Sequence, residues 1–439
     1  MRALAAVFAV LAPLVAAPAL AADAGAALSV DQAIQLALQN NLTTRLAKAQ
    51  TDAARARVLE AAGALLPNAL GYVSQQRVLK TNLAAQGFPP GGLFNPLLGP
   101  YDSFDARVLL SERIFDLESI QRARAAKAGS RLAVLRERLA AEQVSAAAAL
   151  AYLGALRAHR GVETAQADLA LAQRLQALAE DQKRAGSATG LDVARARTRA
   201  AQQQLRLLQA QVAERDVELR LKRVTGLPLG RPVALSDSLK PARLQLPAGD
   251  AAVSDALGRR AEAAAAREAA DQARLLASAA GAARLPSLTL NGDAGVLGNT
   301  PESNSHVTGG FGGRVSLPLF AGGQLAARQR QAKAVSTEEE ARLADELSQI
   351  EEDVRSSLQQ ADAAQQQQTV ASQALGLARQ ELSLAQDRFA AGVGSNVELT
   401  EAQDGLARAE SDETAALVDA NAARVNLAMS LGAMTDFKY

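Results

Sequence analysis

The 439-residue chain carries nearly the same pattern twice. A Leu-Pro pair follows a helical stretch at Pro67 and again at Pro286, and a Phe marks a strand exit at Phe115 and at Phe320. From each Phe onward the copies stay in register at an offset of about 206 residues, far longer than the repeat of a solenoid protein. Two large, similar halves are therefore expected to build one object.

Each half is predicted to contain a helix, a strand pair, a very long helix, a tight turn and a return helix. The predicted order is a signal peptide at 1–21, a first repeat at 22–228 with strands at about 69–80 and 102–115, a linker at 229–249, and a second repeat at 250–439 with strands at about 287–298 and 306–320. Such long helices bury their apolar stripes against neighbours rather than in one compact core. This organisation predicts an oligomer.

The first residues have the features of a secretory signal peptide. Arg2 precedes an apolar run from Ala3 to Val15, and the small-residue pattern of Ala19-Leu20-Ala21 predicts a mature chain that begins at Ala22. An uncleaved anchor is the alternative, but the run is shorter than the roughly 20 residues that a spanning helix needs. No later stretch offers about 18 uncharged apolar residues, which predicts no second spanning helix.

Composition excludes several classes of protein. The chain has no cysteine, so disulfides, thiolate metal sites and a thiol for lipid attachment are excluded. The formal net charge is +1, which gives no indication of nucleic-acid binding. If the chain is held at a membrane, the fold itself must provide the attachment.

The predicted strands alternate in polarity. On 306–317, apolar or small residues at Val307, Phe311 and Val315 alternate with polar residues such as Thr308 and Arg314, and 288–296 and 104–110 show the same period of two. Strand 70–79 alternates poorly. Period two over about ten residues suits a barrel strand with one face toward lipid and one toward a wet interior, although a half-buried sheet of a soluble protein gives a similar pattern.

Aromatic placement favours the membrane barrel. Tryptophan is absent and other aromatics are scarce, yet most of them fall in or beside the strand pairs. They are Tyr72, Phe88, Phe94, Tyr101, Phe104, Phe115, Phe311 and Phe320. Aromatics at strand ends suit the interfacial belts of a membrane barrel.

Four strands cannot close a barrel alone, and a lipid-exposed sheet edge leaves backbone groups without partners. The sheet must therefore close with strands from other copies. Two copies would give eight strands, whose interior is filled by side chains, whereas three would give twelve strands and begin to leave a channel. We therefore expect a trimer.

The long helices are expected to run about 100 Å, because about 70 residues rise 1.5 Å each. Each long helix is followed by a short turn and a helix that runs back, and the residues of the turn are those that end one helix and start the next. Gly186 and Gly392 suit the left-handed residue that ends a helix, and Thr189–Asp192 and Ser395–Glu398 are capping boxes that start the next one. Both turns are therefore predicted to be helical hairpins.

The acidic residues of these turns have two interpretations. Asp192 and Glu398 are explained as caps alone, but the hairpin tips project far from the strands and are a natural contact surface for a partner. Glu401 lies one turn beyond Glu398 and is not needed for the cap. Glu398 and Glu401 from three chains would give six carboxylates around a constriction that favours cations.

No catalytic constellation is present in the sequence. The two histidines, His159 and His306, are isolated, there is no cysteine, and no glycine-rich phosphate loop joins a strand to a helix. The glycine pairs at 309–310 and 312–313 fit small strand positions better than a phosphate cradle. The sequence predicts a non-enzyme without a cofactor.

The chain resembles the TolC-like outer-membrane efflux proteins, also called outer membrane factors. The matching segments span essentially all of the mature chain, and their duplicated order is more specific than any one of them. They are 28–34, 66–67, 191–193, 285–288, 317–323 and, most strongly, Arg388-Phe389-Ala390-Ala391-Gly392.

This resemblance implies a homotrimer that is mainly α-helical, with a twelve-stranded outer-membrane β-barrel continuing into a long periplasmic tunnel of helical hairpins. It implies an exit duct of a tripartite efflux pump or type I secretion system, joined to an inner-membrane transporter through a periplasmic adaptor. The tip residues expected to dock the adaptor are Arg184, Gly186, Thr189, Gly190, Arg388, Gly392, Gly394 and Ser395. The residues expected around the periplasmic aperture are Asp192, Arg195, Glu398 and Glu401.

Three departures from the family pattern bear on these roles. The first tip has Gln182 where the second has Arg388, with Arg184 displaced. Arg195 stands where the second half has Glu401, so it is expected either to remove one acidic ring or to pair with a carboxylate that holds the closed state. The first strand exit, at 115–117, lacks the glycine pair of the second.

A periplasmic coiled-coil adaptor or scaffold is the alternative class, because it also uses long Ala-rich hairpins. Adaptors usually carry one hairpin flanked by β-rich domains, whereas this chain has two hairpins and two strand pairs. The sequence does not distinguish drugs, metal ions or polypeptides as the exported substrate.

Overall fold

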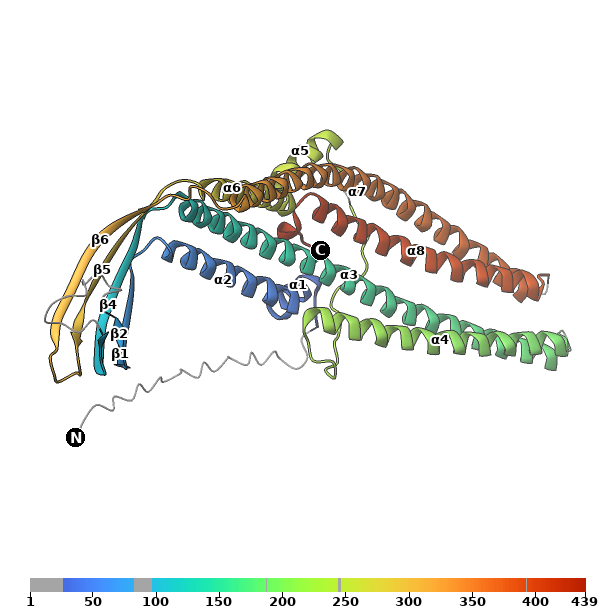
Figure 1. The fold of residues 1–439 in the computed structure, drawn as a ribbon. Helices are drawn as coiled ribbons and strands as arrows, with labels where there is room; N and C mark the ends of the chain where they lie inside the picture. The colour runs from blue at the N-terminus through green and yellow to red at the C-terminus, as the bar shows by residue number, and fades with distance from the viewer. Residues whose placement is uncertain (1–26, 83–96, 187, 244–245, 392) are drawn as a thin grey trace.

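The computed structural model describes residues 27–82, 97–186, 188–243, 246–391 and 393–439. The predicted signal peptide at 1–21 and Gly392 lie outside the described residues. Figure 1 shows an elongated molecule with a β-sheet at one end, two helical hairpins reaching the other end, and short helices packed around its middle.

The two halves contain corresponding elements in the same order. The first half contains α1 (Val30–Asn40), α2 (Leu42–Gly63), β1 (Asn68–Val78), β2 (Thr81–Asn82), β3 (Leu97–Leu98), β4 (Tyr101–Phe115), α3 (Leu117–Arg184) and α4 (Gly190–Thr225). The second contains α5 (Gly249–Arg259), α6 (Ala261–Ala282), β5 (Ser287–Gly298), β6 (His306–Ser316), α7 (Gln324–Ala390), α8 (Asn396–Ser430) and the 3-10 turn η2 (Met434–Asp436).

Two predicted strand ends were wrong. The strand expected to reach residue 320 ends at Ser316, because Pro318 has no backbone N–H to continue the ladder. The strand expected to reach residue 80 ends at Val78.

The two strand exits use different chemistry. Asp116 caps α3 by accepting hydrogen bonds from the backbone N–H groups of Glu118 and Ser119 at 3.1 and 3.4 Å. At the second exit, Gly322 and Gly323 take left-handed conformations, with φ of 57° and 80°. The missing glycine pair of the first half is therefore replaced by a side-chain cap.

The sheet joins the halves in the antiparallel order β1-β4-β5-β6, so β1 and β6 are its two edges. Its register brings the polar positions of all four strands to one face. Tyr72 lies opposite Arg107, which lies opposite Gly295, which lies opposite Thr308. We call this side the polar face.

Charged groups on the polar face pair with one another. Arg107 contacts Asp105 at 2.6 Å and Asp293 at 3.2 Å, and Tyr72 donates a hydrogen bond to Asp105 at 2.8 Å. The opposite, apolar face is bare in the single chain, where Phe311 is 97% exposed and Val307 86%. A sheet with one charged, paired face and one bare apolar face fits a boundary between water and lipid.

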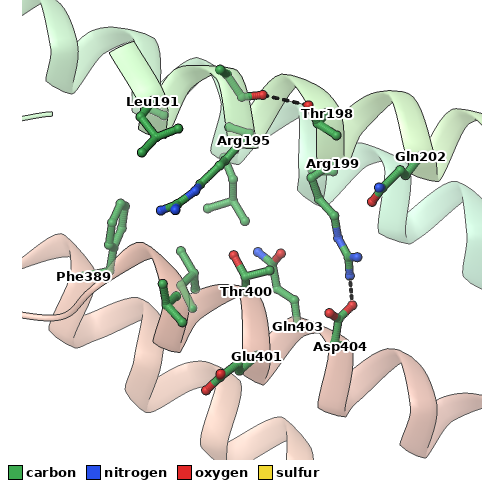
Figure 2. A pocket seen from close by; sticks show the side chains of 17 residues that line it. Leu191, Arg195, Thr198, Arg199, Gln202, Phe389, Thr400, Glu401, Gln403 and Asp404 are labelled. Atoms are coloured by element: carbon green, nitrogen blue, oxygen red, sulfur yellow. Dashed lines mark hydrogen bonds and ion pairs between the residues drawn. The ribbon is translucent and has the colours of Figure 1, made fainter. Parts of the chain in front are cut away.

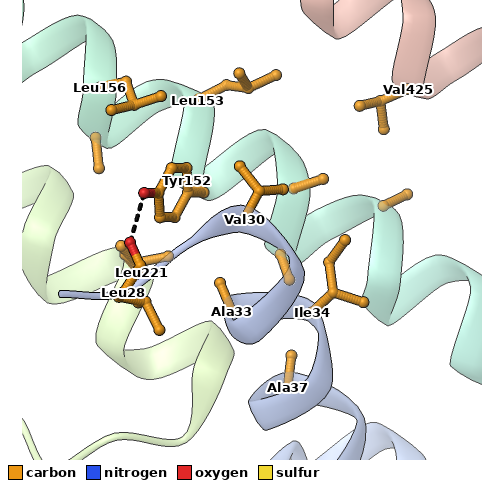
Figure 3. Close-up of a cluster of buried hydrophobic side chains, with 14 of the residues drawn as sticks. Leu28, Val30, Ala33, Ile34, Ala37, Tyr152, Leu153, Leu156, Leu221 and Val425 are labelled. Atoms are coloured by element: carbon orange, nitrogen blue, oxygen red, sulfur yellow. Dashed lines mark hydrogen bonds between the residues drawn. The ribbon is translucent and has the colours of Figure 1, made fainter. Parts of the chain in front are cut away.

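The largest apolar core lies at the middle of the molecule, which we call the waist (Figure 3). Tyr152 of α3 is fully buried and donates a hydrogen bond to the carbonyl of Leu28 at 2.6 Å. Leu28 forms an isolated parallel β-bridge with Leu235, which lies in the segment that joins the two halves. Val425 of α8 also belongs to this core, so the waist fastens both hairpins together.

Helices α3 and α7 have 68 and 67 residues and run past the waist to the tips. Helix α3 contains an 18-residue window with a mean hydropathy of 1.4, long and apolar enough by composition to cross a membrane. Its apolar part is interrupted by Glu142 and Arg157, so it is not the run of about 18 uncharged residues that a spanning helix would need. The window is 61% buried inside the fold, as in a core helix.

Candidate functional site: the hairpin tips and the pocket between them

The first hairpin tip is built as the sequence predicted. Gly186 takes the left-handed conformation with φ of 78°. Thr189 and Asp192 form the capping box, because the Asp192 carboxylate accepts from the Thr189 N–H at 3.0 Å and from its hydroxyl at 2.7 Å. Gly190 is the first residue of α4. Arg184 pairs with Asp181 on its own helix.

The second tip has the same kind of cap. Ser395 and Glu398 form a capping box, with the Glu398 N–H donating to the Ser395 hydroxyl at 3.1 Å. A Cβ added to Gly394 would lie 2.8 Å from the backbone nitrogen of Phe389, so this position requires glycine. Arg388 approaches the Glu398 carboxylate at 3.7 Å across the turn. The basic residues of the two tips therefore have different surroundings.

A pocket of about 560 Å³ lies between the hairpins close to the tips. Residues of α3, α4, α7 and α8 line it, and Arg195 and Glu401 are among them, whereas Asp192 and Glu398 are not. The structure thus brings two of the four predicted aperture residues to one pocket. The other two serve as helix caps.

The ion pair between the two hairpins is formed by Arg199 and not by Arg195. Figure 2 shows Arg199 reaching from α4 to the Asp404 carboxylate on α8, whereas no interaction is drawn from Arg195. Among the described residues, Arg195 has no ion-pair partner within 4.0 Å. Arg199 and Asp404 each lie about one turn beyond the Arg195 and Glu401 positions, but helical spacing alone does not select this pair among the arginines of α4.

Further from the tips, two carboxylates lie between the hairpins. Asp168 of α3 and Glu410 of α8 line a cavity of about 280 Å³, together with Gln203 of α4. Burial raises the pKa of both carboxyls, and the charge of Asp168 raises the pKa of Glu410 further. Gln203 is 3% exposed, and its carbonyl oxygen has no hydrogen-bond partner among the described residues.

Within the described residues, no group of three or more His, Cys, Asp or Glu side chains is arranged to hold a metal ion. His159 contacts Glu214 through Nδ1 at 2.8 Å and Glu163 through Nε2 at 3.6 Å. The two ring nitrogens point in opposite directions, so these carboxylates cannot share one ion with the ring. His159 instead links α3 to α4.

An open sheet with one polar and one bare apolar face, continued by two helical hairpins with a pocket between their tips, defines the subunit of a membrane channel with a long helical extension. The chain belongs to the outer membrane efflux protein family, whose model matches residues 33–227 and 252–433. Members of this family are outer-membrane channels and are not enzymes.

Individual relatives agree with this membership. The chain is 28% identical over 332 residues to the alkaline protease secretion protein AprF of Pseudomonas aeruginosa, covering 73% of this chain and 67% of AprF. Its fold is similar to the Campylobacter jejuni CmeC outer membrane channel, with a TM-score of 0.82 at 20% identity over 92% of this chain and 85% of CmeC. It is also similar to VceC of Vibrio cholerae, with a TM-score of 0.79 at 21% identity over 92% of this chain and 96% of VceC.

Proposed function

We propose that three copies of this chain form a twelve-stranded outer-membrane barrel that continues into a periplasmic tunnel of helical hairpins. The trimer is a passive exit duct for an inner-membrane transporter, reached through a periplasmic adaptor. Similarity to a protein named for alkaline protease secretion favours a type I secretion system over drug efflux. Residues 1–21 are the signal peptide, and 22–228 and 250–439 are the two repeats joined by 229–249.

The observation that carries this proposal is the open sheet. Its edges, β1 and β6, lie on opposite sides of the chain, and its apolar face is bare. A sheet edge in lipid must be paired, so β6 of one chain is expected to pair with β1 of the next until the ring closes. Four strands from each of three chains give twelve.

Each hairpin also carries an exposed apolar stripe, and the two stripes lie on opposite sides of the chain, as the two sheet edges do. Leucine and valine side chains at heptad spacing are exposed along α4 and, separately, along α7. They are Leu205, Leu208, Val212 and Leu219 on α4, and Val370, Leu377 and Leu384 on α7. Helix α4 lies on the β1 side of the molecule and α7 on the β6 side (Figure 1). A head-to-tail ring would bury α4 of one chain against α7 of its neighbour.

The tips are proposed to dock the adaptor through Arg184, Gly186, Thr189, Gly190, Arg388, Gly392, Gly394 and Ser395, of which Gly392 lies outside the described residues. The aperture is proposed to involve Asp192, Arg195, Glu398 and Glu401. The different surroundings of Arg184 and Arg388 support unequal adaptor contacts by the two tips.

Glu401 gives the sharpest test of the aperture. Replacing it with alanine should raise single-channel conductance in a planar bilayer by about twofold or more and weaken block by divalent cations, because charged rings set access at pore constrictions. Asp181→Ala is the control, since this carboxylate is near the first tip but does not line the pocket. Unchanged conductance and unchanged block would refute the role of Glu401.

Electron microscopy of the detergent-solubilised mature protein tests the assembly. Three-fold cylinders with a detergent belt at one end are expected, with helices contributing about 100 Å of length. Slender monomers without a belt would overturn the barrel and favour the periplasmic scaffold.

A further inference from the structure

A second groove lies next to the sheet, at the other end of the molecule from the tips. It has a volume of about 860 Å³ and runs over α3 between α2 and α6. Its floor on α3 is made of small residues, including Ala126, Gly129 and Ala133. From Glu118 to Arg136 the lining spans 18 helical steps of 1.5 Å, or about 27 Å.

The lining of this groove is strongly basic. Its charged residues are Arg57, Arg122, Arg136, Arg328 and a single acid, Glu118, so the formal charge is +3 per chain. Arg122 pairs with Glu118. Within the described part of the chain, the other three arginines form no ion pair within 4.0 Å, so their guanidinium groups are available to a ligand.

Helices α2, α3 and α6 pack side by side in one layer, which we call the wall. Helix α2 indicates on which side of this wall the groove lies. At the strand junction, Ala64 lines a smaller pocket together with Asn68 and Ser111, which belong to the polar face of the sheet. Arg57 precedes Ala64 by seven residues and therefore lies on nearly the same side of the helix. The groove is thus on the polar-face side.

Helix α3 gives the same result independently. Arg113, also on the polar face of β4, donates a hydrogen bond to the hydroxyl of Ser119 at 3.1 Å. Ser119 shares a helix face with Arg122 and Ala126, three and seven residues further on. Arg124 and Lys127 lie on the opposite face of α3, about 200° away from Arg122 and Gly129.

We infer that this groove is a binding site for acidic segments of a polypeptide passing through the channel. The inference rests on the proposed function, because the polar-face side of the wall becomes the lumen only when the trimer closes. Three grooves then form a basic collar below the barrel. Rings of arginine select anions in pores, and guanidinium groups bind carboxylates in bidentate fashion. A groove of about 27 Å accommodates about eight residues of extended chain.

The test measures binding of fluorescein-labelled poly-L-glutamate to the detergent-solubilised protein by fluorescence anisotropy. Arg57→Gln with Arg136→Gln should weaken binding about tenfold at low salt, because charge-assisted contacts are lost. The matched control is Arg124→Gln with Lys127→Gln, which removes two positive charges from the opposite face of the same wall and should change binding less than twofold. Labelled poly-L-lysine should not bind at this site.

A second readout places the site in the lumen. In planar bilayers, poly-L-glutamate added on the barrel side should block wild-type channels, and the groove variant should relieve this block while the control variant does not. Equal responses of the two variants in both assays would overturn the inference and leave the channel intact. Failure of the wild-type chain to form channels would overturn the proposed function, and the luminal site with it.

Discussion

Ionisation of Asp168 and Glu410 opposes contact between the hairpins, because these carboxyls from α3 and α8 line one cavity and repel each other when charged. Burial is the main cause of the raised pKa of both groups, and for Asp168 the nearby Arg199 and Arg206 offset it only in part. Arg160 and Arg379 favour the charged form of Glu410, while Glu413 opposes it. The folded chain therefore holds these protons more tightly than the unfolded chain.

This difference predicts a pH dependence with a definite sign. Below the ordinary carboxyl pKa both states are protonated and the contact between the hairpins is strongest, and stability falls as the pH rises from that value through the raised values of the folded state. Asp168→Asn removes one ionisation, so hydrogen-exchange protection of α8 should increase at pH 7 and match the wild type near pH 4. Asp412→Asn on the exposed face of α8 is the control. A gain from Asp168→Asn that is equal at both pH values would contradict the assignment.

The two hairpins are individually well specified by local sequence, but their mutual contact is not. Glycine turns and capping boxes predicted both tips, because this chemistry acts within a few residues. The pairing of Arg199 with Asp404 joins residues 205 positions apart, and which of several arginines on α4 reaches α8 depends on the exact rotation of packed helices. An ion pair from Arg195 is one of the two alternatives that the sequence leaves open, whereas the contact within one chain comes from Arg199.

Breaking this pair should loosen the hairpins without unfolding either one. Asp404→Asn should increase hydrogen exchange in the first turns of α8 by about fivefold, since a partly exposed ion pair contributes about 1 kcal/mol. Arg197→Gln is the matched control, because Arg197 pairs with Glu180 inside a single hairpin. If both variants raise exchange in α8 equally, the Arg199–Asp404 pair does not hold the hairpins together.

At the level of the assembly, alternation in the strands predicted a polar and an apolar face, and the register of the sheet bears this out. Strand 70–79 alternated poorly in sequence, because Leu70 lies on the polar face opposite Leu109 and polar Gln75 lies on the apolar face. The number of copies that would close the proposed ring is not encoded in any one strand. It depends on the curvature of the sheet and on contacts between chains, and the polarity pattern of one sequence contains neither.

The absence of cysteine makes the ring directly testable. Val212→Cys on α4 combined with Val370→Cys on α7 should give disulfide-linked dimers and trimers on oxidation, with no larger species, if the two stripes face each other between chains, because both positions lie about 30 Å from the tips. Each single variant is the control and should give no ladder. A ladder that continues beyond three chains would indicate an open head-to-tail polymer instead of a closed ring.

The waist also acts as a fulcrum. Helix α8 reaches the core around Tyr152 at Val418, so the part between the second tip and the waist is about 33 Å long. A tilt of about 5° at the waist would move the tip by about 3 Å, comparable to the diameter of a water molecule. A partner that binds only the tips can therefore displace them while the packed core at the waist rotates by only a few degrees. Such small rotations at the waist suffice to change the width of the space between the hairpins.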